Sequence, residues 1–475
     1  MKRSSVRLGL LASAVALAWT SRAIAQNQTT NTSPILSSNN VPFTVQIDQA
    51  PFSLPDGLQS FVVGTYMDKW LLLAGRINGL HGFNPGNNNF PPDTQNTTVF
   101  VVDVTSQTVA TASLTNQASG LTQAQIDLLS VTAPQFFQSR TTLYVAGGYG
   151  IDTATTNFTT KPALTAINIP GLIHWVTAPT NGETAAQYIR QTFNPLFQIT
   201  GGAMLQPSPK HALLVFGQDF EGAATVTSDG TYSEQVRQFR IVTKGTNLSI
   251  VAGTSLPATP NPDFRRASLN VVPIFAHGRP SYAAFSGGFT PTDGIWTIPV
   301  EISAKGVATE TSPTNATTFM QAMNNWTCPT LELYSQKQSV SYSVLMGGIS
   351  YGFFSGTNFE TDPELPFINQ VTTITRNKQG VYSQSLINAQ YPVILSTGSN
   401  PGNQLLFGAN AVFIPAPGLP VYKNGVLKYD KLGANAVLVG YIVGGIQSTL
   451  PNTDTESDSA ASPYIFTVTL VPTVP

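Results

Sequence analysis

The segment Thr142–Tyr149 reads TLYVAGGY, an apolar run that ends in two glycines and an aromatic residue. An apolar run closed by one or two glycines recurs five more times along the chain. The recurrences are KWLLLAGR to Arg76, ALLVFGQ to Gln218, YAAFSGG to Gly288, YSVLMGG to Gly348 and YIVGG to Gly445. The first glycines of the six runs extend from Gly75 to Gly444, with a mean spacing of about 74 residues. Such self-similarity predicts a repeat architecture.

Each glycine run lies inside a unit of about four predicted strands. A shorter apolar segment precedes it, as in SFVVGTY, a third strand follows it, as in TTVFVVDV, and a fourth such as TVATASL closes most units. Runs of this length, rich in Val, Ile, Thr and aromatic residues and bounded by Gly, Pro and Asn, are typical of β-strands. Six such units predict an all-β chain folded as a six-bladed β-propeller, in which each sheet packs between two neighbours. The glycines are expected where the second strand approaches the next blade, because a residue without Cβ tolerates that approach.

The sixth unit is one strand short, because the chain ends at Pro475 after its third strand. The segment VPFTVQID, Val41 to Asp48, alternates like a strand and precedes the first full unit. We therefore expect this N-terminal strand to close the last blade. Residues 41–475 would then form a single six-bladed propeller domain.

The repeat resembles that of the kelch and galactose-oxidase-like propellers, in which a strand ending in Gly-Gly is followed by a Tyr and, later, by a Trp. The GGY at 147–149 followed by Trp175 fits this pattern. Two copies depart from it, with GR at 75–76 and GQ at 217–218, and the period exceeds the usual kelch repeat of about 50 residues. The resemblance spans nearly all of the chain after residue 40. It implies the kelch-like fold and leaves the function open, since one fold hosts many functions.

The first 25 residues have the features of a secretory signal peptide. Three basic residues precede an apolar stretch, Leu8–Trp19, that is too short for a membrane span. The stretch leads to the A-x-A pattern at 23–25 that signal peptidase needs. We expect residues 1–25 to be removed, the polar residues 26–40 to form a disordered leader, and the protein to be secreted or periplasmic with no membrane span after cleavage.

Charge and cysteine content restrict the classes of partner. The chain has 23 Lys and Arg against 24 Asp and Glu, and the signal peptide holds four of the basic residues and no acidic one, which leaves 19 against 24, a net charge of −5. Nucleic acids and anionic lipids require clustered Lys and Arg, so this composition predicts no nucleic-acid partner and no basic field for lipids. Cys328 is the only cysteine, which excludes an intramolecular disulfide.

The loops after the glycine runs are the candidate binding surface. Rotation about the propeller axis relates these loops, so all six are expected on one face, and long loops on a rigid scaffold commonly carry function. Aromatic faces beside carboxylates and an Arg suit a sugar, whose C–H face stacks and whose hydroxyls hydrogen-bond. The candidate ligand-binding residues are Arg76, His81, Phe83, Tyr149, Asp152, Asp219, Glu221, Tyr351, Phe353 and Glu360. Alternatively, these loops pack on one another with their acids facing water.

Three acids in the sixth loop, Asp454, Glu456 and Asp458, alternate like the first ligands of a Ca²⁺ loop. Ser459 stands where the sharp turn of such a loop needs Gly, and Ile465 where a bidentate Glu is needed. These three residues are therefore candidates for a looser Ca²⁺ site, or a solvated acidic loop. No other cofactor is predicted.

Two features of the sequence bear on whether the protein is an enzyme. The segment GISYG at 348–352 matches G-x-S-x-G, but FFSGTNF after it does not supply the helix that a nucleophile elbow needs. The kelch resemblance also includes sialic-acid mutarotases, and it implies that an Arg would hold the sugar carboxylate. Arg76, Arg265 and Arg266 are the candidates for that role.

The sequence thus predicts an exported kelch-like propeller that binds an extracellular glycan or protein through its loop face. The alternatives are a carbohydrate-active enzyme of the mutarotase, epimerase or hydrolase type, and a structural surface protein. An enzyme should gather a carboxylate and an Arg or His near the axis, a binder should show an open aromatic platform, and a scaffold should show packed loops.

Overall fold

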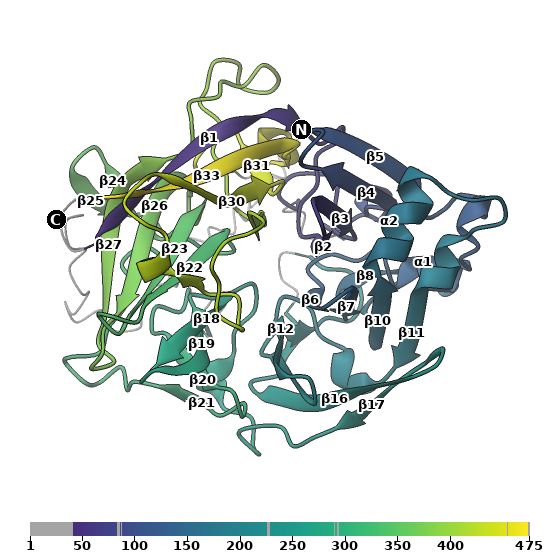
Figure 1. The fold of residues 1–475 in the computed structure, drawn as a ribbon, viewed down its shortest axis with the longest axis horizontal. Helices are drawn as coiled ribbons and strands as arrows, with labels where there is room; N and C mark the ends of the chain where they lie inside the picture. Colours follow the sequence, from purple (N-terminus) through teal and green to yellow (C-terminus); the bar gives the residue numbers. More distant parts are fainter. Residues whose placement is uncertain are drawn as a thin grey trace, which may run out of the picture.

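The computed structural model describes residues 41–82, 86, 88–225, 229–288, 290–291, 294–453 and 455–473. The predicted signal peptide and leader lie outside these ranges. Within them, six sheets of four antiparallel strands each, one of them extended by a short fifth strand, are arranged in a ring, with the first of the four strands nearest the centre and the fourth outermost (Figure 1). This confirms the predicted all-β, six-bladed β-propeller.

The strands of blades 1 to 3 follow one another outwards in chain order. Blade 1 consists of β2 (Val62–Tyr66), β3 (Lys69–Leu73), β4 (Thr98–Asp103) and β5 (Thr108–Ser113). Blade 2 consists of β6 (Gln135–Ser139), β7 (Thr142–Ala146), β10 (Ala163–Asn168) and β11 (Ile189–Phe193). Blade 3 consists of β12 (Ala203–Ser208), β13 (His211–Val215), β16 (Val236–Lys244) and β17 (Asn247–Ala252).

Blades 4 and 5 repeat this order, and blade 6 takes its outermost strand from the other end of the chain. Blade 4 consists of β18 (Asn270–Ala276), β19 (Arg279–Phe285), β20 (Val300–Ser303) and β21 (Ala308–Glu310). Blade 5 consists of β22 (Thr330–Ser335), β23 (Val340–Ile349), β26 (Phe367–Arg376) and β27 (Tyr382–Gln390). Blade 6 consists of β28 (Val412–Pro415), β30 (Val437–Val443), β33 (Tyr464–Pro472) and β1 (Phe43–Ser53).

The second strand of each blade supplies much of the core. In β3, β7 and β13 every residue except the first is buried. Leu71 and Leu73 of blade 1 share one apolar cluster with Leu143 and Val145 of blade 2. Full burial of each such side chain stabilises the fold by about 1.5–3 kcal/mol. The core is therefore a series of apolar layers between neighbouring blades.

The glycine at the end of a second strand allows the next blade to approach closely. Gly147 has a φ of +63°, and a Cβ on it would lie 2.0 Å from the carbonyl oxygen of Ile199, at the entry to blade 3. The same carbonyl accepts a hydrogen bond from the Gly148 N–H at 2.9 Å. Equivalent bonds join Gly75 to Val131, Gly217 to Arg266, Gly348 to Phe407 and Gly445 to Leu58. The predicted reason for the glycines is confirmed.

Six residues with a left-handed backbone conformation surround the axis. Each lies just before the first strand of its blade. These residues, which we call the axial ring, are Ser60, Ala133, Gly201, Ser268, Thr327 and Asn410, with φ between +47° and +65°. Within the ring, the Ser60 N–H donates to Asn410 O at 3.3 Å and the Asn410 N–H donates to Thr327 O at 2.9 Å. The Gly201 N–H donates in the same way to Ala133 O at 3.0 Å. These bonds fix adjacent blades to one another at the centre.

Strand β1 closes the ring. It pairs antiparallel with β33 from Phe43↔Pro472 to Gln49↔Phe466. Its alternate residues Phe43, Val45 and Ile47 are buried in a core cluster shared by blades 5 and 6. The prediction that the N-terminal strand completes the last blade is confirmed.

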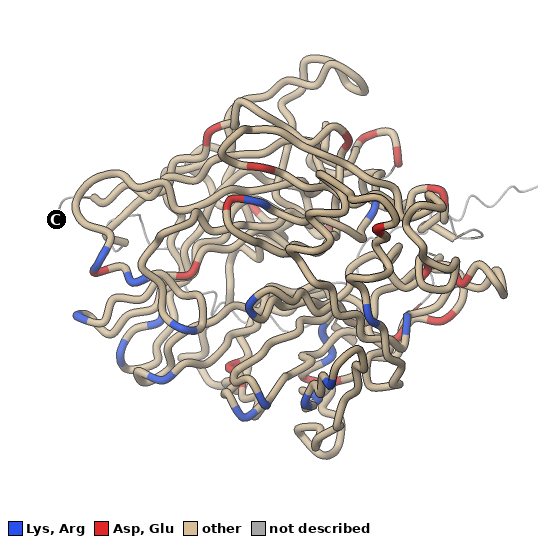
Figure 2. The backbone as a smooth tube through the Cα atoms, turned by 45° about the vertical axis from the view of Figure 1, so that its right-hand side comes forward, with Lys and Arg blue, Asp and Glu red and all other residues tan. Residues whose placement is uncertain are grey.

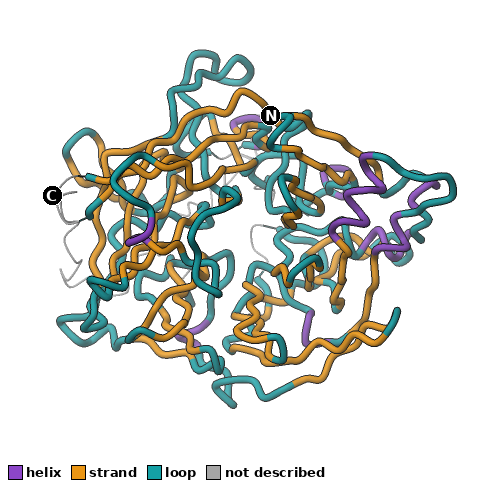
Figure 3. The backbone as a smooth tube through the Cα atoms, viewed as in Figure 1, coloured by secondary structure: helices purple, strands orange, loops and turns teal. Residues whose placement is uncertain are grey.

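Elements outside the repeat are short. Helices α1 (Gln123–Asp127) and α2 (Ile169–Thr177) lie on the outer side of blades 1 and 2 (Figure 3). Trp175, which fitted the kelch pattern by sequence, is buried within α2. Strand β29 (Leu427–Lys428) belongs to an insertion in blade 6 and pairs in parallel with β22, on its central edge. In the described part of the chain, no helix is long and apolar enough to cross a membrane.

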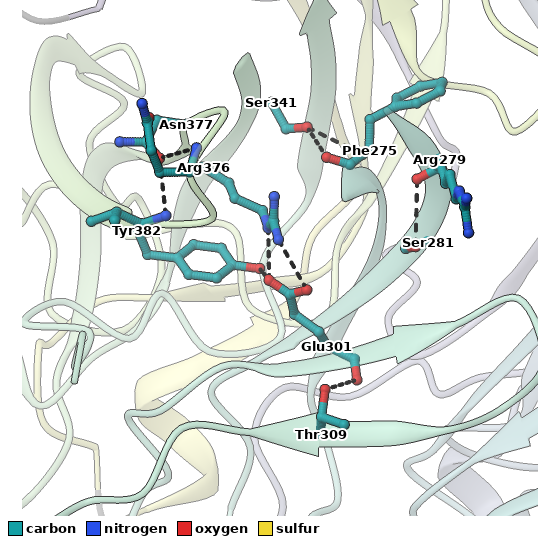
Figure 4. Close-up of polar contacts among 11 residues, drawn as sticks. Phe275, Arg279, Ser281, Glu301, Thr309, Ser341, Arg376, Asn377 and Tyr382 are labelled. Carbon is teal, nitrogen blue, oxygen red and sulfur yellow. Dashed lines mark hydrogen bonds and ion pairs between the residues drawn. The ribbon is translucent and has the colours of Figure 1, made fainter. Parts of the chain in front are cut away.

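A polar cluster ties blade 4 to blade 5. Glu301 on β20 accepts hydrogen bonds from Arg376 Nε at 2.7 Å and Arg376 Nη2 at 3.2 Å (Figure 4). The hydroxyl of Tyr382 donates to the same carboxylate at 2.8 Å. Bidentate pairs of this kind combine strength with directional specificity, so this cluster is a structural link between the two blades.

Candidate functional site

The loops after the second strands, together with the connections between blades, form one face of the ring, which we call the glycine-loop face. Four of these loops contain small hairpins: β8 (Tyr149–Asp152) with β9 (Asn157–Thr160), β14 (Gln218–Asp219) with β15 (Thr231–Tyr232), β24 (Gly352–Ser355) with β25 (Asn358–Thr361), and β31 (Ile446–Ser448) with β32 (Ser459–Ala461). The loops contact one another: the Asn89 N–H of blade 1 donates to Ala224 O of blade 3 at 2.8 Å. The opposite face carries the tighter strand turns, and we call it the turn face.

Arg76 holds the blade 1 loop in place and is 2% exposed. Its Nε donates to Asn78 Oδ1 at 3.0 Å, and its Nη2 donates to Pro91 O at 3.1 Å and to the hydroxyl of Thr94. The guanidinium lies 5.1 Å from the ring centroid of Phe90. Burial lowers the pKa of Arg76 to about 10. This Arg therefore serves the conformation of its own loop.

Tyr149 is 4% exposed and lies beneath the contact between the loops of blades 1 and 3. Its hydroxyl donates to Gly222 O at 2.6 Å and accepts from the Ala224 N–H at 3.2 Å. The rings of Phe220 and Phe90 contact it edge-on, at centroid distances of 5.5 and 5.9 Å. Burial raises the pKa of Tyr149 to about 12. Tyr149 is thus part of a packed cluster and offers no open stacking platform.

His81 joins the same cluster through Phe90. The two ring centroids are 5.1 Å apart, and Nδ1 of His81 lies 2.7 Å from the carbonyl oxygen of Gly82. Burial lowers the pKa of His81, which keeps the imidazole neutral at pH 7. The structure therefore gathers Arg76, His81 and Tyr149 around Phe90, a residue that the sequence analysis did not single out. The candidate Phe83 lies outside the described residues.

Asp219 and Glu221 form a pair of acids in the blade 3 loop. Glu221 is exposed, and its Oε1 accepts from Gln198 Nε2 at 2.6 Å and from the Thr159 hydroxyl at 2.9 Å. In the described part of the chain, the buried Oδ1 of Asp219 has no hydrogen-bond partner. Burial, followed by the neighbouring Glu221, raises the pKa of Asp219. This pair combines a carboxylate at the surface with an unsatisfied acceptor behind it.

Asp152 shapes a turn at the end of β8. Its Oδ1 accepts from the N–H groups of Ala154 and Thr155, both at 3.1 Å. Near it, Lys161 is 3% exposed and donates from Nζ to Ile151 O at 2.7 Å. Burial lowers the pKa of Lys161. No local sequence signal marks this buried cation, because it lies in an ordinary polar loop.

Tyr351, Phe353 and Glu360 belong to a separate group on the β24–β25 hairpin of blade 5. The hairpin lies on the opposite side of the ring from β8 (Figure 1). Phe353 pairs with Glu360 across the hairpin, and Glu360 is exposed while Phe353 and Tyr351 are half-buried. The structure therefore does not bring these three candidates to the cluster around Phe90.

The described calcium candidates, Glu456 and Asp458, lie in the blade 6 loop of the glycine-loop face. Asp458 accepts from the hydroxyl of Thr455 at 2.8 Å and from Asn400 Nδ2 at 3.1 Å. Glu456 lies close to Gly82, and Asp454 lies outside the described residues. Among the residues that are described, no group of three or more His, Cys, Asp or Glu side chains could hold a metal ion.

Ser350, the central residue of the G-x-S-x-G match, is fully buried. Its hydroxyl donates to Gly352 O at 2.6 Å and accepts from the Asn324 N–H at 2.9 Å. The serine therefore stabilises the start of the blade 5 hairpin, in agreement with the interpretation of this match as chance.

Charges are strongly segregated between the two faces (Figure 2). The described loops of the glycine-loop face hold fourteen acidic residues against four basic ones, a net charge of −10. The acids are Asp56, Asp93, Asp127, Asp152, Asp219, Glu221, Asp229, Glu234, Asp263, Glu360, Asp362, Glu364, Glu456 and Asp458, and the basic residues are Arg76, Lys161, Arg265 and Arg266. The described turns of the turn face hold eight basic residues against three acidic ones, a net charge of +5. The basic residues are Arg140, Lys210, Lys305, Lys337, Lys378, Lys423, Lys428 and Lys431, and the acids are Asp68, Glu183 and Asp430.

A cavity of about 310 Å³ faces the axis between the first strands of blades 4, 5 and 6. Its lining includes Asn270, Cys328 and Glu332. The Oε1 atom of Glu332 is covered and has no hydrogen-bond partner among the described residues. Burial raises the pKa of Glu332 to about 7 and that of Cys328 to about 12. In the sequence, LELYS has only the pattern of a strand, and nothing in that pattern marks this carboxyl group.

The fold and its two unlike faces define a six-bladed β-propeller with an acidic loop surface. No protein-family model and no curated protein matches the chain. Among solved structures, it is similar to the one titled "Structure of YjhT", with a TM-score of 0.43 and 10% sequence identity over 86% of this chain and 95% of that chain.

Proposed function

We propose that this protein is an exported β-propeller that binds a carbohydrate through its glycine-loop face. The observation that carries the proposal is the excess of fourteen acidic over four basic residues in the described loops of that face. Carboxylates accept hydrogen bonds from hydroxyl and ammonium groups, and those with charged partners are the strongest. The N-terminal pattern of residues 1–25 supports export.

The arginines of this face favour a neutral or amino sugar over an acidic one. Arg76 is buried among the atoms of its own loop. Arg266 is fully buried and pairs with Glu310 at 2.9 Å, and Arg265 pairs with Asp229. A sugar carboxylate would therefore find its three candidate partners engaged and would meet a surface of net negative charge.

The Asp219–Glu221 pair is the proposed centre of the binding surface. Glu221 is exposed, Gln198 and Phe220 beside it are half-buried, and Phe220 offers an apolar ring next to two carboxyl groups. This combination matches a sugar, because an apolar C–H face and several hydroxyl groups are presented together. Asp219 beside it is half-buried, and its covered Oδ1 has no hydrogen-bond partner among the described residues.

Isothermal titration calorimetry tests the proposal. Purified exported protein is titrated with glucosamine oligomers, with their N-acetylated counterparts and with an oligomer of galacturonic acid. Binding is expected for the first two and not for the acid. The double variant Asp219→Asn/Glu221→Gln should bind at least about tenfold more weakly, since losing a hydrogen bond to a charged group costs about 1.5–3 kcal/mol.

The matched control is Asp68→Asn, which removes one carboxylate from the turn face and should leave the affinity unchanged. Equal binding of the acidic oligomer would contradict the proposal. Failure of all three sugars to bind, together with capture of a basic peptide, would replace it with recognition of a protein.

A further inference from the structure

The turn face presents exposed basic side chains from five of the six blades. Nine such residues lie in its turns or at the adjoining strand ends: Arg140, Lys210, Lys244, Arg279, Lys305, Lys337, Lys378, Lys423 and Lys431. In the described part of the chain, none of the nine forms an ion pair with a carboxylate. Figure 2 shows most of the Lys and Arg positions in the lower part of the view and most of the Asp and Glu positions in its upper and right-hand parts. The basic field of this face is therefore not neutralised by the protein itself.

Exposed aliphatic side chains stand beside several of these lysines. Val307 is 48% exposed and lies two residues after Lys305 in the outer turn of blade 4. Val381 is 59% exposed and lies three residues after Lys378 in the equivalent turn of blade 5. In blade 6, Val421, 42% exposed, lies two residues before Lys423, and in blade 1 Met67 is 79% exposed at the tip of its turn. Thus three blades present an apolar tip next to a basic residue, and a fourth presents an apolar tip.

We propose that the turn face docks on an anionic lipid surface. Lipid headgroups of negative charge attract Lys and Arg, and the boundary between headgroups and acyl chains accepts aliphatic tips. Single-stranded nucleic acid would instead favour aromatic side chains for stacking. The nine residues include seven Lys and two Arg, and the exposed large apolar residues of the turns are Met and Val. The combination therefore fits a lipid surface better than a nucleic acid.

The opposite charge of the two faces gives the docked molecule one orientation. With the turn face on the lipid, the loops of net charge −10 point away from it, where repulsion from the headgroups is smallest. Without residues 1–25 the net charge is −5, which by itself predicts no basic field, because a sum over the chain hides the separation of the charges. Docking would leave the glycine-loop face free for its own ligand.

Vesicle co-sedimentation tests the proposal. The protein is recovered after export and its N-terminus is read by mass spectrometry, because a retained apolar stretch at 8–19 would bind any vesicle. Binding is expected to vesicles of phosphatidylcholine with about a third of phosphatidylglycerol and not to phosphatidylcholine alone. The double variant Lys305→Gln/Lys378→Gln should bind about 30-fold more weakly, because each Lys near such a surface contributes about 1 kcal/mol and 1.4 kcal/mol is tenfold.

The control variant Gln117→Glu/Ala154→Glu changes the net charge equally but on exposed positions of the glycine-loop face, and its binding should stay within about twofold of the original protein. Circular dichroism confirms that both variants are folded. Equal loss in both variants, equal binding to neutral vesicles, or tighter binding to single-stranded DNA than to the anionic vesicles would each overturn the proposal.

Discussion

Glu332 is a carboxylic acid on a strand whose neighbours Leu331 and Leu333 are buried in the core. Its folded-state pKa of about 7 lies above the ordinary value of 4.5, so the folded protein resists its ionisation. Ionisation of Glu332 therefore destabilises the folded protein. This destabilisation is absent at low pH, grows as the pH rises from about 4.5 to about 7, and is complete above about 7. Replacement by Gln should stabilise the protein at pH 8 by about 1–3 kcal/mol, because it removes the cost of keeping a buried carboxylate ionised.

Urea unfolding at pH 4 and pH 8 measures this effect. The two proteins should have similar stability at pH 4, and Glu332→Gln should be the more stable at pH 8. The change Glu301→Gln serves as a contrast, because it removes the carboxylate partner of Arg376 and should destabilise the protein at pH 8. A Gln variant that is less stable than the original protein at pH 8 would show that the carboxylate has a stabilising partner in the cavity.

The burial of Tyr149 is a property that the sequence did not predict. The position of Tyr149 after a glycine pair was read correctly from the sequence, and its burial was not. The atoms that cover its hydroxyl belong to Gly222 and Ala224, more than 70 residues away. Local patterns place a residue on a loop, but only the packing of several loops decides whether its side chain is exposed.

At the scale of elements, β1 is the segment on which ring closure depends. Val45 faces the core and is 2% exposed, whereas the adjacent Gln46 points to solvent. Val45→Asp should therefore destabilise the protein by at least about 3 kcal/mol, since it removes a buried side chain and buries a charge. Gln46→Asp, on the other side of the same strand, should change the stability by less than about 0.5 kcal/mol.

Urea unfolding and hydrogen exchange measure the consequence. In Val45→Asp the amides of β33 that pair with β1 should lose protection before those of blade 3. If β33 kept its protection in a folded variant, closure of the ring would not depend on β1.

The elements that repeat were predictable, whereas α2 and β29, which occur once, were not. In every blade the strands pack against the two neighbouring blades, so the same positions are buried and apolar each time. This repeated apolar pattern predicted the six blades. Helix α2 was missed, although Asn168 caps it and Pro170 occupies its first turn, because its apolar residues also suit a strand. The pairing of β29 with β22 joins segments about 90 residues apart, and no local signal specifies it.

At the scale of the whole molecule, the separation of charge is the property that composition concealed. Even the short five-residue strands between the faces extend about 17 Å, which exceeds the screening length of about 10 Å at 0.1 M salt. Each face should therefore act on a charged surface largely independently of the other. The net charge of −5 that remains without residues 1–25 would by itself predict retention only on an anion exchanger.

We expect the protein without residues 1–25 to be retained on both anion and cation exchangers at pH 7 and about 0.1 M salt. Lys305→Gln/Lys378→Gln should elute earlier from the cation exchanger and nearly unchanged from the anion exchanger, because it alters the turn face only. Gln117→Glu/Ala154→Glu should elute later from the anion exchanger and nearly unchanged from the cation exchanger. If both variants shifted equally on both columns, the protein would be responding as one average charge, and the two faces would not act as separate binding surfaces.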